Sequence, residues 1–384
     1  MTRILQQNMD IRESHNKAME LAALADLQKA QGNKDNAKSL YEESYSFEYE
    51  AAMNAYNSNV GEPSVSVLLR SAASLAMSCN KLREAEKLIA LALSGEPPPE
   101  IAEELRNLLE NVNFYRHLEV IGTELSDDEV QLVIAGNGVG YGYAKTDEII
   151  NRINFFKDLT VRTIERLSGK NFRKSGPIAP EHKKIIDNAY MTSLQAASMA
   201  FRIKFGNPSQ PTLPGFSSYR TIIDDITENI ALINDDRIDT LKERIKETAY
   251  FNNFLALTKE LAPDGKTVNL FGITSIKQGQ EKKTLLTEKR EKISEVIRIN
   301  QSESGTSNNK IEKGLNQTVN GILKVANATT NTVEINIDGA KIKMKVPDGL
   351  SDIVRKYWDE KVIVEYHKKN QKENLLVNIE EAKE

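Results

Sequence analysis

The feature that most constrains this chain is a helical pattern near its start that occurs twice, in residues 16–49 and 65–98. In each copy apolar residues recur three and four positions apart, a turn residue interrupts them, and the spacing resumes, which predicts two helices joined by a turn. The first copy carries Leu21, Leu24, Ala25, Gly32, Ala37, Tyr41 and Ser44, and the second carries Leu69, Ala72, Ala73, Ala76, Asn80, Ala85, Ile89, Ala92 and Pro97. Small side chains let antiparallel helices approach closely. Because one helix pair cannot bury its apolar face alone, the pattern predicts helices that stack.

This order of residues resembles the tetratricopeptide repeat, in which a large residue, a leucine and small residues precede an aromatic, an alanine and a closing proline. The resemblance covers residues 16–111. The usual Trp and Gly positions of the family hold other residues here: Leu21 and Leu69, Ala25 and Ala73. The second-helix alanines, Ala37 and Ala85, lie 48 residues apart, whereas the family period is about 34. We expect the excess to lie in residues 48–63.

The resemblance implies a protein that holds partners and does not catalyse, with ligand-facing side chains on the first helix of each unit. The candidate contacts are polar residues on those helices: Asn16, Gln28, Arg70 and Ser74. Three prolines at 97–99 precede residues 100–111, which we expect to form a closing helix. A plain helical bundle without a binding role is the alternative interpretation.

Length and charge bound the remaining possibilities. A chain of 384 residues is long enough for two or three domains, and its net charge of −4 supplies no global field for nucleic acid or membrane. The single cysteine, Cys79, cannot form an internal disulfide and fits a reducing compartment. No signal peptide and no run of about 20 apolar residues is visible, so we expect a cytoplasmic protein without a membrane partner. The oligomeric state stays open.

After the repeats the pattern changes to mixed strands and helices, which predicts an α+β domain over residues 114–299. The expected strands are 117–121, 130–135, 139–144, 199–205 and 268–274, and the expected helices are 148–167, 219–233 and 239–261. Asn137-Gly138 between two apolar runs is a strong hairpin signal, because both central residues of such a turn need a positive φ. Prolines 208, 211 and 214 indicate a loop.

In the last part of the chain, apolar and polar residues alternate with a period of two. Residues 300–313 are rich in Ser, Asn and Gly and predict a linker. Beyond it, over residues 314–384, we expect strands at 319–325, 332–337, 341–346, 362–366 and 375–379, with a helix at 350–356. Three strands, a helix and two strands is the element order of an OB-type five-stranded barrel, and an SH3-like barrel is the near alternative. The expected fold is therefore multidomain: helical repeats over 1–113, then the α+β domain, the linker and the barrel.

The whole chain also resembles a group of bacterial repeat proteins that end in a small β-barrel. The resemblance rests on three segments: RHLEVIGTEL at 116–125, APDGKTVNLFGIT at 262–274 and VPDGLSDIV at 346–354. It implies one architecture for the full chain. It supplies no activity and no catalytic residue.

The sequence carries no recognisable catalytic motif. The glycine-rich stretch 136–142 alternates Gly with other residues and does not open directly onto a helix, so it fails as a dinucleotide fingerprint and reads as a hairpin. The four histidines lack metal-ligand spacing, and no G-x-S-x-G elbow is present. We therefore expect no catalytic residue, no metal site and no cofactor.

Basic residues are the remaining candidates for chemistry. Arg162 and Arg166 lie one helical turn apart and are candidates for clamping an anion together; the alternative is a solvated face that pairs with Glu165 or Asp158. In the barrel, lysines at 341, 343 and 345 alternate on one strand, and the aromatic candidates for base stacking are Tyr357, Trp358 and Tyr366. Residues 316–384 carry 11 basic and 11 acidic residues, which weakens a nucleic-acid role. We expect the only tryptophan to cover the barrel core.

Three functions remain open. The first is a non-enzymatic cytoplasmic adaptor that binds a protein partner through its helical repeats. The second is a nucleic-acid or nucleotide sensor that uses the barrel or the arginine-rich helix from Arg152 to Arg173. The third is an enzyme of unknown class in the middle domain. The adaptor is the leading hypothesis because the repeats are the strongest pattern in the chain.

Overall fold

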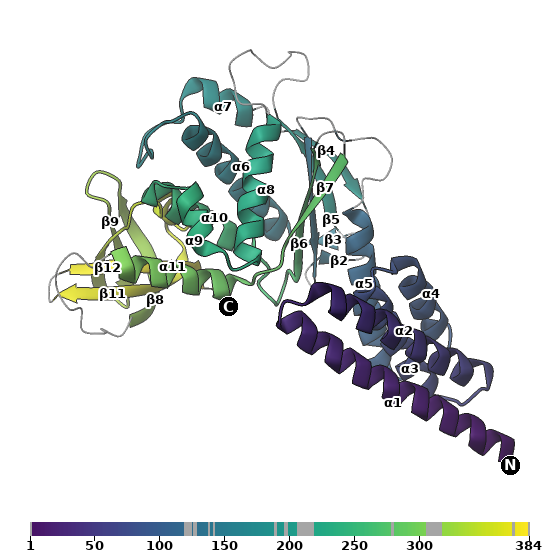
Figure 1. Ribbon diagram of the computed structural model, residues 1–384. Helices are drawn as coiled ribbons and strands as arrows, with labels where there is room; N and C mark the ends of the chain where they lie inside the picture. Colours follow the sequence, from purple (N-terminus) through teal and green to yellow (C-terminus); the bar gives the residue numbers. More distant parts are fainter. Residues whose placement is uncertain are drawn as a thin grey trace. The chain divides into compact units, whose positions relative to one another are not determined.

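The computed structural model describes residues 2–118, 125, 129–136, 139–140, 143–187, 190–195, 199–205, 219–277, 280–304, 317–370 and 373–382. The chain divides into two compact units, Met1–His117 and Leu118–Glu384. Figure 1 labels most of the helices and strands of the two units.

The first unit is helical, as predicted. Its helices are α1 (Thr2–Ala30), α2 (Lys34–Asn57), α3 (Ser64–Ser78), α4 (Leu82–Leu93) and α5 (Pro99–His117), and each packs on the next along the chain. The four small residues that the repeat pattern places at the helix contacts are all buried: Ala25, Ala37, Ala73 and Ala85. Small side chains at these positions allow the helices to lie close together.

The two turns that join α1 to α2 and α3 to α4 have the same geometry. Gly32 and Asn80 both take a positive φ, of 83° and 58°. In each turn the following amide reaches back to a carbonyl five residues earlier, from Asn33 to Gln28 and from Lys81 to Ala76. This is a Schellman-type ending, which favours Gly or Asn at the left-handed position. The extra spacing between the two copies arises partly because α2 continues to Asn57.

The second unit contains a five-stranded antiparallel sheet in the order β4-β5-β1-β6-β7. The strands are β1 (Glu129–Ala135), β4 (Tyr190–Gln195), β5 (Met199–Lys204), β6 (Leu270–Lys277) and β7 (Gln280–Leu286), and a short separate pair is formed by β2 (Val139–Gly140) and β3 (Tyr143–Ala144). In the central strand, Leu132 lies opposite Phe201 of β5 and Ile273 of β6. All three side chains are buried, so one face of the sheet forms the core.

Helices cover that face. They are α6 (Thr146–Leu167), α8 (Tyr219–Asn234) and α10 (Thr248–Leu261); the same part of the chain also forms α7 (Pro180–Asp187), α9 (Ile238–Arg244) and α11 (Arg290–Ser304). Figure 1 shows α6, α8 and α10 on the same side of the sheet. Their apolar side chains and those of the sheet belong to one contiguous core.

The chain ends in a closed five-stranded barrel, as predicted. Its elements are β8 (Gln317–Asn327), β9 (Thr332–Ile337), β10 (Ala340–Lys345), α12 (Ser351–Lys356), β11 (Lys361–Asn370) and β12 (Glu373–Glu381). The strand order is β10-β12-β11-β8-β9, with β9 also paired to β10. The third strand pairs in parallel with the fifth, at Lys345 and Leu375, and the helix stands between the third and fourth strands. This connectivity is of the OB type.

The barrel and the sheet share one core. Buried apolar residues of the barrel, such as Leu323, Val362 and Leu376, belong to the same cluster as Leu132 and Phe201 of the sheet. The barrel is therefore packed on the α+β part and both lie in one compact unit.

Some expected elements differ in detail. The helix expected at 239–261 is two helices, because Ile245 leaves helical geometry (φ −104°, ψ 76°) and its side chain is buried. The strand expected at 139–144 is the short pair β2 and β3. His117, expected at the start of a strand, ends α5. Residues 300–304, expected in the linker, are the end of α11; residues 305–313, the Asn137-Gly138 turn and the proline loop lie outside the described residues.

Candidate functional site

A groove runs between α3 and α5 in the helical unit. It encloses about 370 Å³, and its lining is mostly polar: Arg70, Ser71, Ser74, Glu104, Asn107, Leu108 and Asn111. Two of the predicted contacts, Arg70 and Ser74, lie in this lining. Arg70 forms an ion pair with Glu104 of α5. The groove thus joins two helices that are not consecutive in the chain, in keeping with their packing.

The other two predicted contacts lie on α1. Asn16 is exposed to solvent. Gln28 is half-buried, and its side-chain oxygen accepts a hydrogen bond of 2.9 Å from Asn33. Five lining residues were not among the predicted contacts: Ser71, Glu104, Leu108, Asn107 and Asn111. Asn107 and Asn111 are the two amides among them. They lie one turn apart in the expected closing helix, so their spacing was a visible signal.

A buried carboxyl group lies beside this groove. Glu48 of α2 is fully buried, and its two oxygens lie 2.8 and 3.0 Å from Nδ1 of His15 on α1. Burial raises the pKa of Glu48, although His15, a hydrogen bond with Ser71 and the charge of Arg70 act in the opposite direction. Because Ser71 and Arg70 also line the groove, Glu48 links the groove to the interior of the helical unit.

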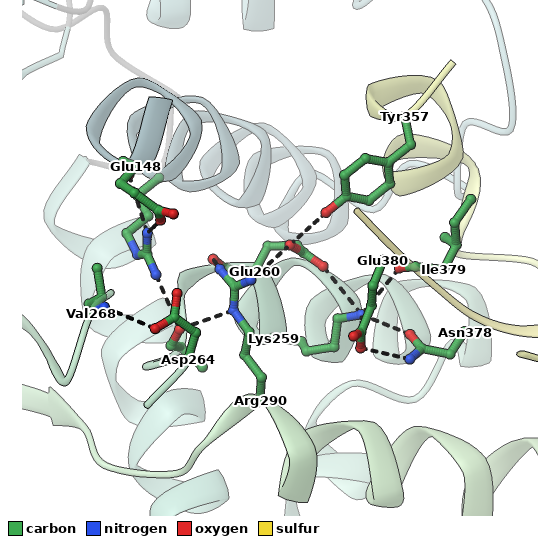
Figure 2. A network of polar contacts seen from close by, with 12 residues as sticks. Glu148, Lys259, Glu260, Asp264, Val268, Arg290, Tyr357, Asn378, Ile379 and Glu380 are labelled. Atoms are coloured by element: carbon green, nitrogen blue, oxygen red, sulfur yellow. Dashed lines mark hydrogen bonds and ion pairs between the residues drawn. The ribbon is translucent and has the colours of Figure 1, made fainter. Parts of the chain in front are cut away.

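A larger cavity, of about 790 Å³, lies in the second unit. It is bounded by the start of α6, the end of α10, the turn after α10, α11 and the barrel. We call it the joint cavity, because elements of both the α+β part and the barrel line it. Figure 2 shows the network of polar side chains beside it.

Lys259 and Glu260, at the end of α10, are the centre of this network. Both residues are only 2 % exposed, and Lys259 Nζ lies 3.2 Å from Glu260 Oε1. Lys259 donates to the side chain of Asn378 at 2.7 Å and lies 3.4 Å from Glu380, both on β12. Glu260 accepts a hydrogen bond of 2.9 Å from the hydroxyl of Tyr357, as Figure 2 shows. These contacts hold the barrel on α10.

Two arginines complete the network. Arg290 of α11 donates to the carbonyls of Glu260 and Ala262 at 2.9 and 3.3 Å. Arg152 of α6 is 1 % exposed and pairs with Glu148; burial, and then the charge of Arg290, lowers its pKa. Its Nε is buried without a hydrogen-bond partner in the described part of the chain. An unpaired buried donor is costly, so this nitrogen is available to a water molecule or a polar ligand.

The turn after α10 belongs to the APDGKTVNLFGIT segment. Asp264 accepts hydrogen bonds from the backbone amides of Lys266, Thr267 and Val268, at 2.7 to 2.9 Å. Burial raises the pKa of Asp264, but these three donors outweigh it and the net pKa is lowered. These hydrogen bonds hold the turn that follows Ala262, whose carbonyl accepts a hydrogen bond from Arg290.

Arg162 and Arg166, the two candidates for clamping an anion together, lie in a second polar region. Arg162 is 4 % exposed and grips Asp352 of α12 through Nε and Nη2, at 2.7 and 2.8 Å, while Nη1 lies 2.8 Å from Glu165. Arg166 pairs with Asp225 of α8 instead. The two guanidinium groups are thus one turn apart on α6 but bind different carboxylates. Burial raises the pKa of Asp352, and Arg162 outweighs that effect and lowers it.

The VPDGLSDIV segment forms the remaining contact of the barrel with α10. Asn253 donates to the Gly349 carbonyl at 2.8 Å and to Asp352 at 2.9 Å, and Asn252 donates to the Asp348 carbonyl at 3.2 Å. Gly349 has a φ of 103°. A Cβ at this position would meet the Ala249 carbonyl oxygen at 2.5 Å. The VPDGLSDIV segment therefore holds the two parts of the second unit together.

Barrel aromatics divide into buried and exposed. Tyr357 and Tyr366 are buried, whereas Trp358 is 60 % exposed. The expectation that Trp358 covers the barrel core is therefore wrong. The lysines at 341, 343 and 345 are exposed on β10, as their alternation predicted.

The described part of the chain contains no group of three or more His, Cys, Asp or Glu that is able to hold a metal ion. Cys79 is buried, and burial raises its pKa, which disfavours the reactive thiolate. Among the helices described, none has the length and apolar character to cross a membrane.

Comparison with family models, with curated proteins and with solved structures finds no match to this chain.

Proposed function

We propose that this chain is a non-enzymatic adaptor whose helical unit holds an extended segment of a partner protein in the groove between α3 and α5. The groove itself, about 370 Å³ with a polar lining, is the observation that supports this proposal. The hydroxyl group of Ser74 and the amide groups of Asn107 and Asn111 offer both donors and acceptors, whereas the Ser71 hydroxyl already bonds Glu48. That mixture suits the backbone N–H and C=O groups of an extended peptide.

The chemistry of the groove also indicates what kind of segment it takes. Its one charged pair, Arg70 with Glu104, is already neutralised within the lining. A strongly charged partner would gain little there, because a charge must find an uncompensated opposite charge to bind well. A polar, nearly uncharged segment is therefore the expected occupant, with Asn16 and Gln28 on α1 as outer contacts.

A peptide-display selection against the full chain tests this proposal. The wild type and the double variant Asn107→Ala/Asn111→Ala are used as targets, and Asn57→Ala serves as a control because Asn57 is an exposed amide residue on α2 outside the groove. We expect the selected peptides to bind the double variant at least about tenfold more weakly, which corresponds to about 1.4 kcal/mol. Selected peptides that bind all three proteins equally would contradict the groove as the site.

A further inference from the structure

A smaller cavity lies at the rim of the barrel, where β8 turns into β9. It encloses about 290 Å³, and we call it the rim cavity. Its floor is apolar, with Val333, Val346 and Val354 all buried. Trp358 lines one side and remains 60 % exposed. A volume of this size is at the lower end of ligand pockets, so it suits one ring-sized group.

The indole of Trp358 is held in place although it faces solvent. Its Nε1 donates to the Lys324 carbonyl at 3.2 Å. The backbone on either side is bonded to β8, with the amide of Asp359 donating to the Leu323 carbonyl at 2.8 Å and the Leu323 amide to the Glu360 carbonyl at 3.1 Å. Tyr357, one residue earlier, contacts Glu260 instead. A fixed, exposed aromatic face loses little conformational entropy when a flat ring covers it.

Positive charge lies on another side of the rim cavity. Arg355 is exposed, and no ion pair or hydrogen bond of its side chain is found within the described residues. Lys174, 57 % exposed, is paired with Asp348 at 2.9 Å. No carboxylate belongs to the lining as described. Arg355 also interacts electrostatically with Asp158 and Asp352, which lie outside this lining. The cavity therefore offers two partly compensated cations to an anionic group.

Uncharged polar residues also line the cavity: Asn327, Asn331, Thr332 and Ser351. Ser351 Oγ is buried and has no hydrogen-bond partner in the described part of the chain. The side-chain oxygen of Asn327 accepts from the amides of Thr329 and Thr330, so its NH₂ group is left as a donor toward the lining. A hydroxyl and an amide donor beside an aromatic face are the groups that read the edge of a nucleobase.

We infer that the rim cavity binds a nucleotide, with the base stacked on Trp358 and the phosphate held by Arg355 and Lys174. This inference goes beyond the adaptor function and rests on a different unit, so either can fail without the other. The balance of 11 basic and 11 acidic residues over 316–384 gives a long strand little additional attraction. The occupant favoured is accordingly a single nucleotide, free or at an accessible position in a single strand.

The chain contains one tryptophan, so its fluorescence reports this cavity directly. The full chain is titrated with uridine monophosphate, adenosine monophosphate, uridine and a short oligothymidylate, with excitation that tyrosine does not absorb. We expect saturable quenching by the monophosphates and clearly weaker binding of uridine. If the oligothymidylate binds through two phosphate contacts, its log K should fall with log salt with a slope of about −1.4. A much steeper slope would identify an extended nucleic-acid surface and overturn the single-nucleotide site.

Variants separate this site from general quenching. Arg355→Met and Lys174→Met should weaken monophosphate binding, whereas Lys341→Met should not, because Lys341 is an exposed lysine of β10 outside the cavity lining. Equilibrium dialysis with labelled nucleotide extends the test to Trp358→Ala, for which we expect roughly five- to hundredfold weaker binding, and to Trp358→Phe, which should retain part of the affinity. No quenching by any of the probes, equal affinity for uridine and uridine monophosphate, or unchanged binding in Trp358→Ala would each overturn the inference.

Discussion

Glu48 illustrates how one buried side chain ties three helices together. It projects from α2, bonds His15 of α1 and Ser71 of α3, and is fully buried. A carboxyl group in such a place is more easily accommodated neutral than charged, which is why its pKa is raised. The free energy of unfolding of the helical unit therefore depends on pH through the buried carboxyl group of Glu48.

We predict that Glu48→Gln removes this pH dependence of the stability. A carboxyl group with a raised pKa adds its full stability below its ordinary pKa of 4.5, and that stability is lost as pH rises through the raised value. Thermal unfolding of the full chain is followed by circular dichroism from pH 4 upward. As pH rises, the unfolding temperature of the variant should increase relative to that of the wild type. Glu43→Gln, an exposed carboxylate change on the same helix, should show no such trend. A pH-independent difference between Glu48→Gln and wild type would contradict the assignment.

At the scale of elements, small residues decide how closely the helices pack. Ala85 is fully buried on α4, and Ala90 is exposed on the same helix. The turns at Gly32 and Asn80 have the same backbone geometry, so in each of the two pairs the first helix is followed by the second at a similar turn. The helical unit thus depends on side-chain size at a few contacts and on backbone conformation at two turns.

Ala85→Phe is predicted to destabilise the helical unit by about 1–3 kcal/mol, because the added ring overpacks a filled contact. Ala90→Phe is the matched control, since it adds the same ring to the same helix at an exposed position. Chemical denaturation of both variants measures the difference. Full stability in Ala85→Phe would argue against close packing of α4 through this face.

Gly349 is the corresponding test in the second unit. With a φ of 103° and the Ala249 carbonyl 2.5 Å from any added Cβ, Gly349→Ala combines backbone strain with a steric clash. Gly339→Ala, in the β9–β10 turn, has a similar φ of 89° but open space around the new Cβ. We expect Gly349→Ala to lose about 1–3 kcal/mol of stability and more than the control in urea unfolding. Equal losses would mean that strain alone, and not contact with α10, requires glycine here.

At the scale of the whole molecule, the barrel is a docked part of the second unit. Apolar residues of barrel and sheet form one core, and two polar clusters lie across the contact. One joins Lys259 and Glu260 to β12 and Tyr357, and the other joins Arg162 to Asp352. Removal of one partner of such a buried pair leaves an uncompensated charge and costs about 3–5 kcal/mol.

We predict that a protease site engineered into residues 305–316 is cut without release of the barrel. Size-exclusion chromatography of the cleaved protein should show both fragments eluting together under native conditions. After the same cleavage, Arg162→Met should allow separation, because Asp352 of the barrel loses the buried cation that joins it to α6. Cleaved wild type that separates at once would show that the barrel folds and stands alone.

The helical unit and the barrel were predictable from the sequence alone, because helical and strand periodicities are local properties of the chain, whereas β4, β7, α7 and α11 were not predicted. The helix pairs with their turns at Gly32 and Asn80, and three strands, a helix and two strands at the end, were all predictable in this way. The groove was half predictable: Arg70 and Ser74 followed from the repeat pattern, but Asn107 and Asn111 become groove residues only once α5 packs on α3.

Only the tertiary structure decided which charges meet and which ring faces solvent. Arg162 and Arg166 have a spacing that suits a shared anion, yet Asp352 lies 190 positions after Arg162 and still takes its guanidinium. Trp358 and Tyr357 are neighbours of similar character, and the placement of α10 buries Tyr357 while Trp358 remains exposed. Such pairings arise from packing between distant segments, where burial makes an unpaired charge costly. No local pattern records that cost, so it appears only in the folded chain.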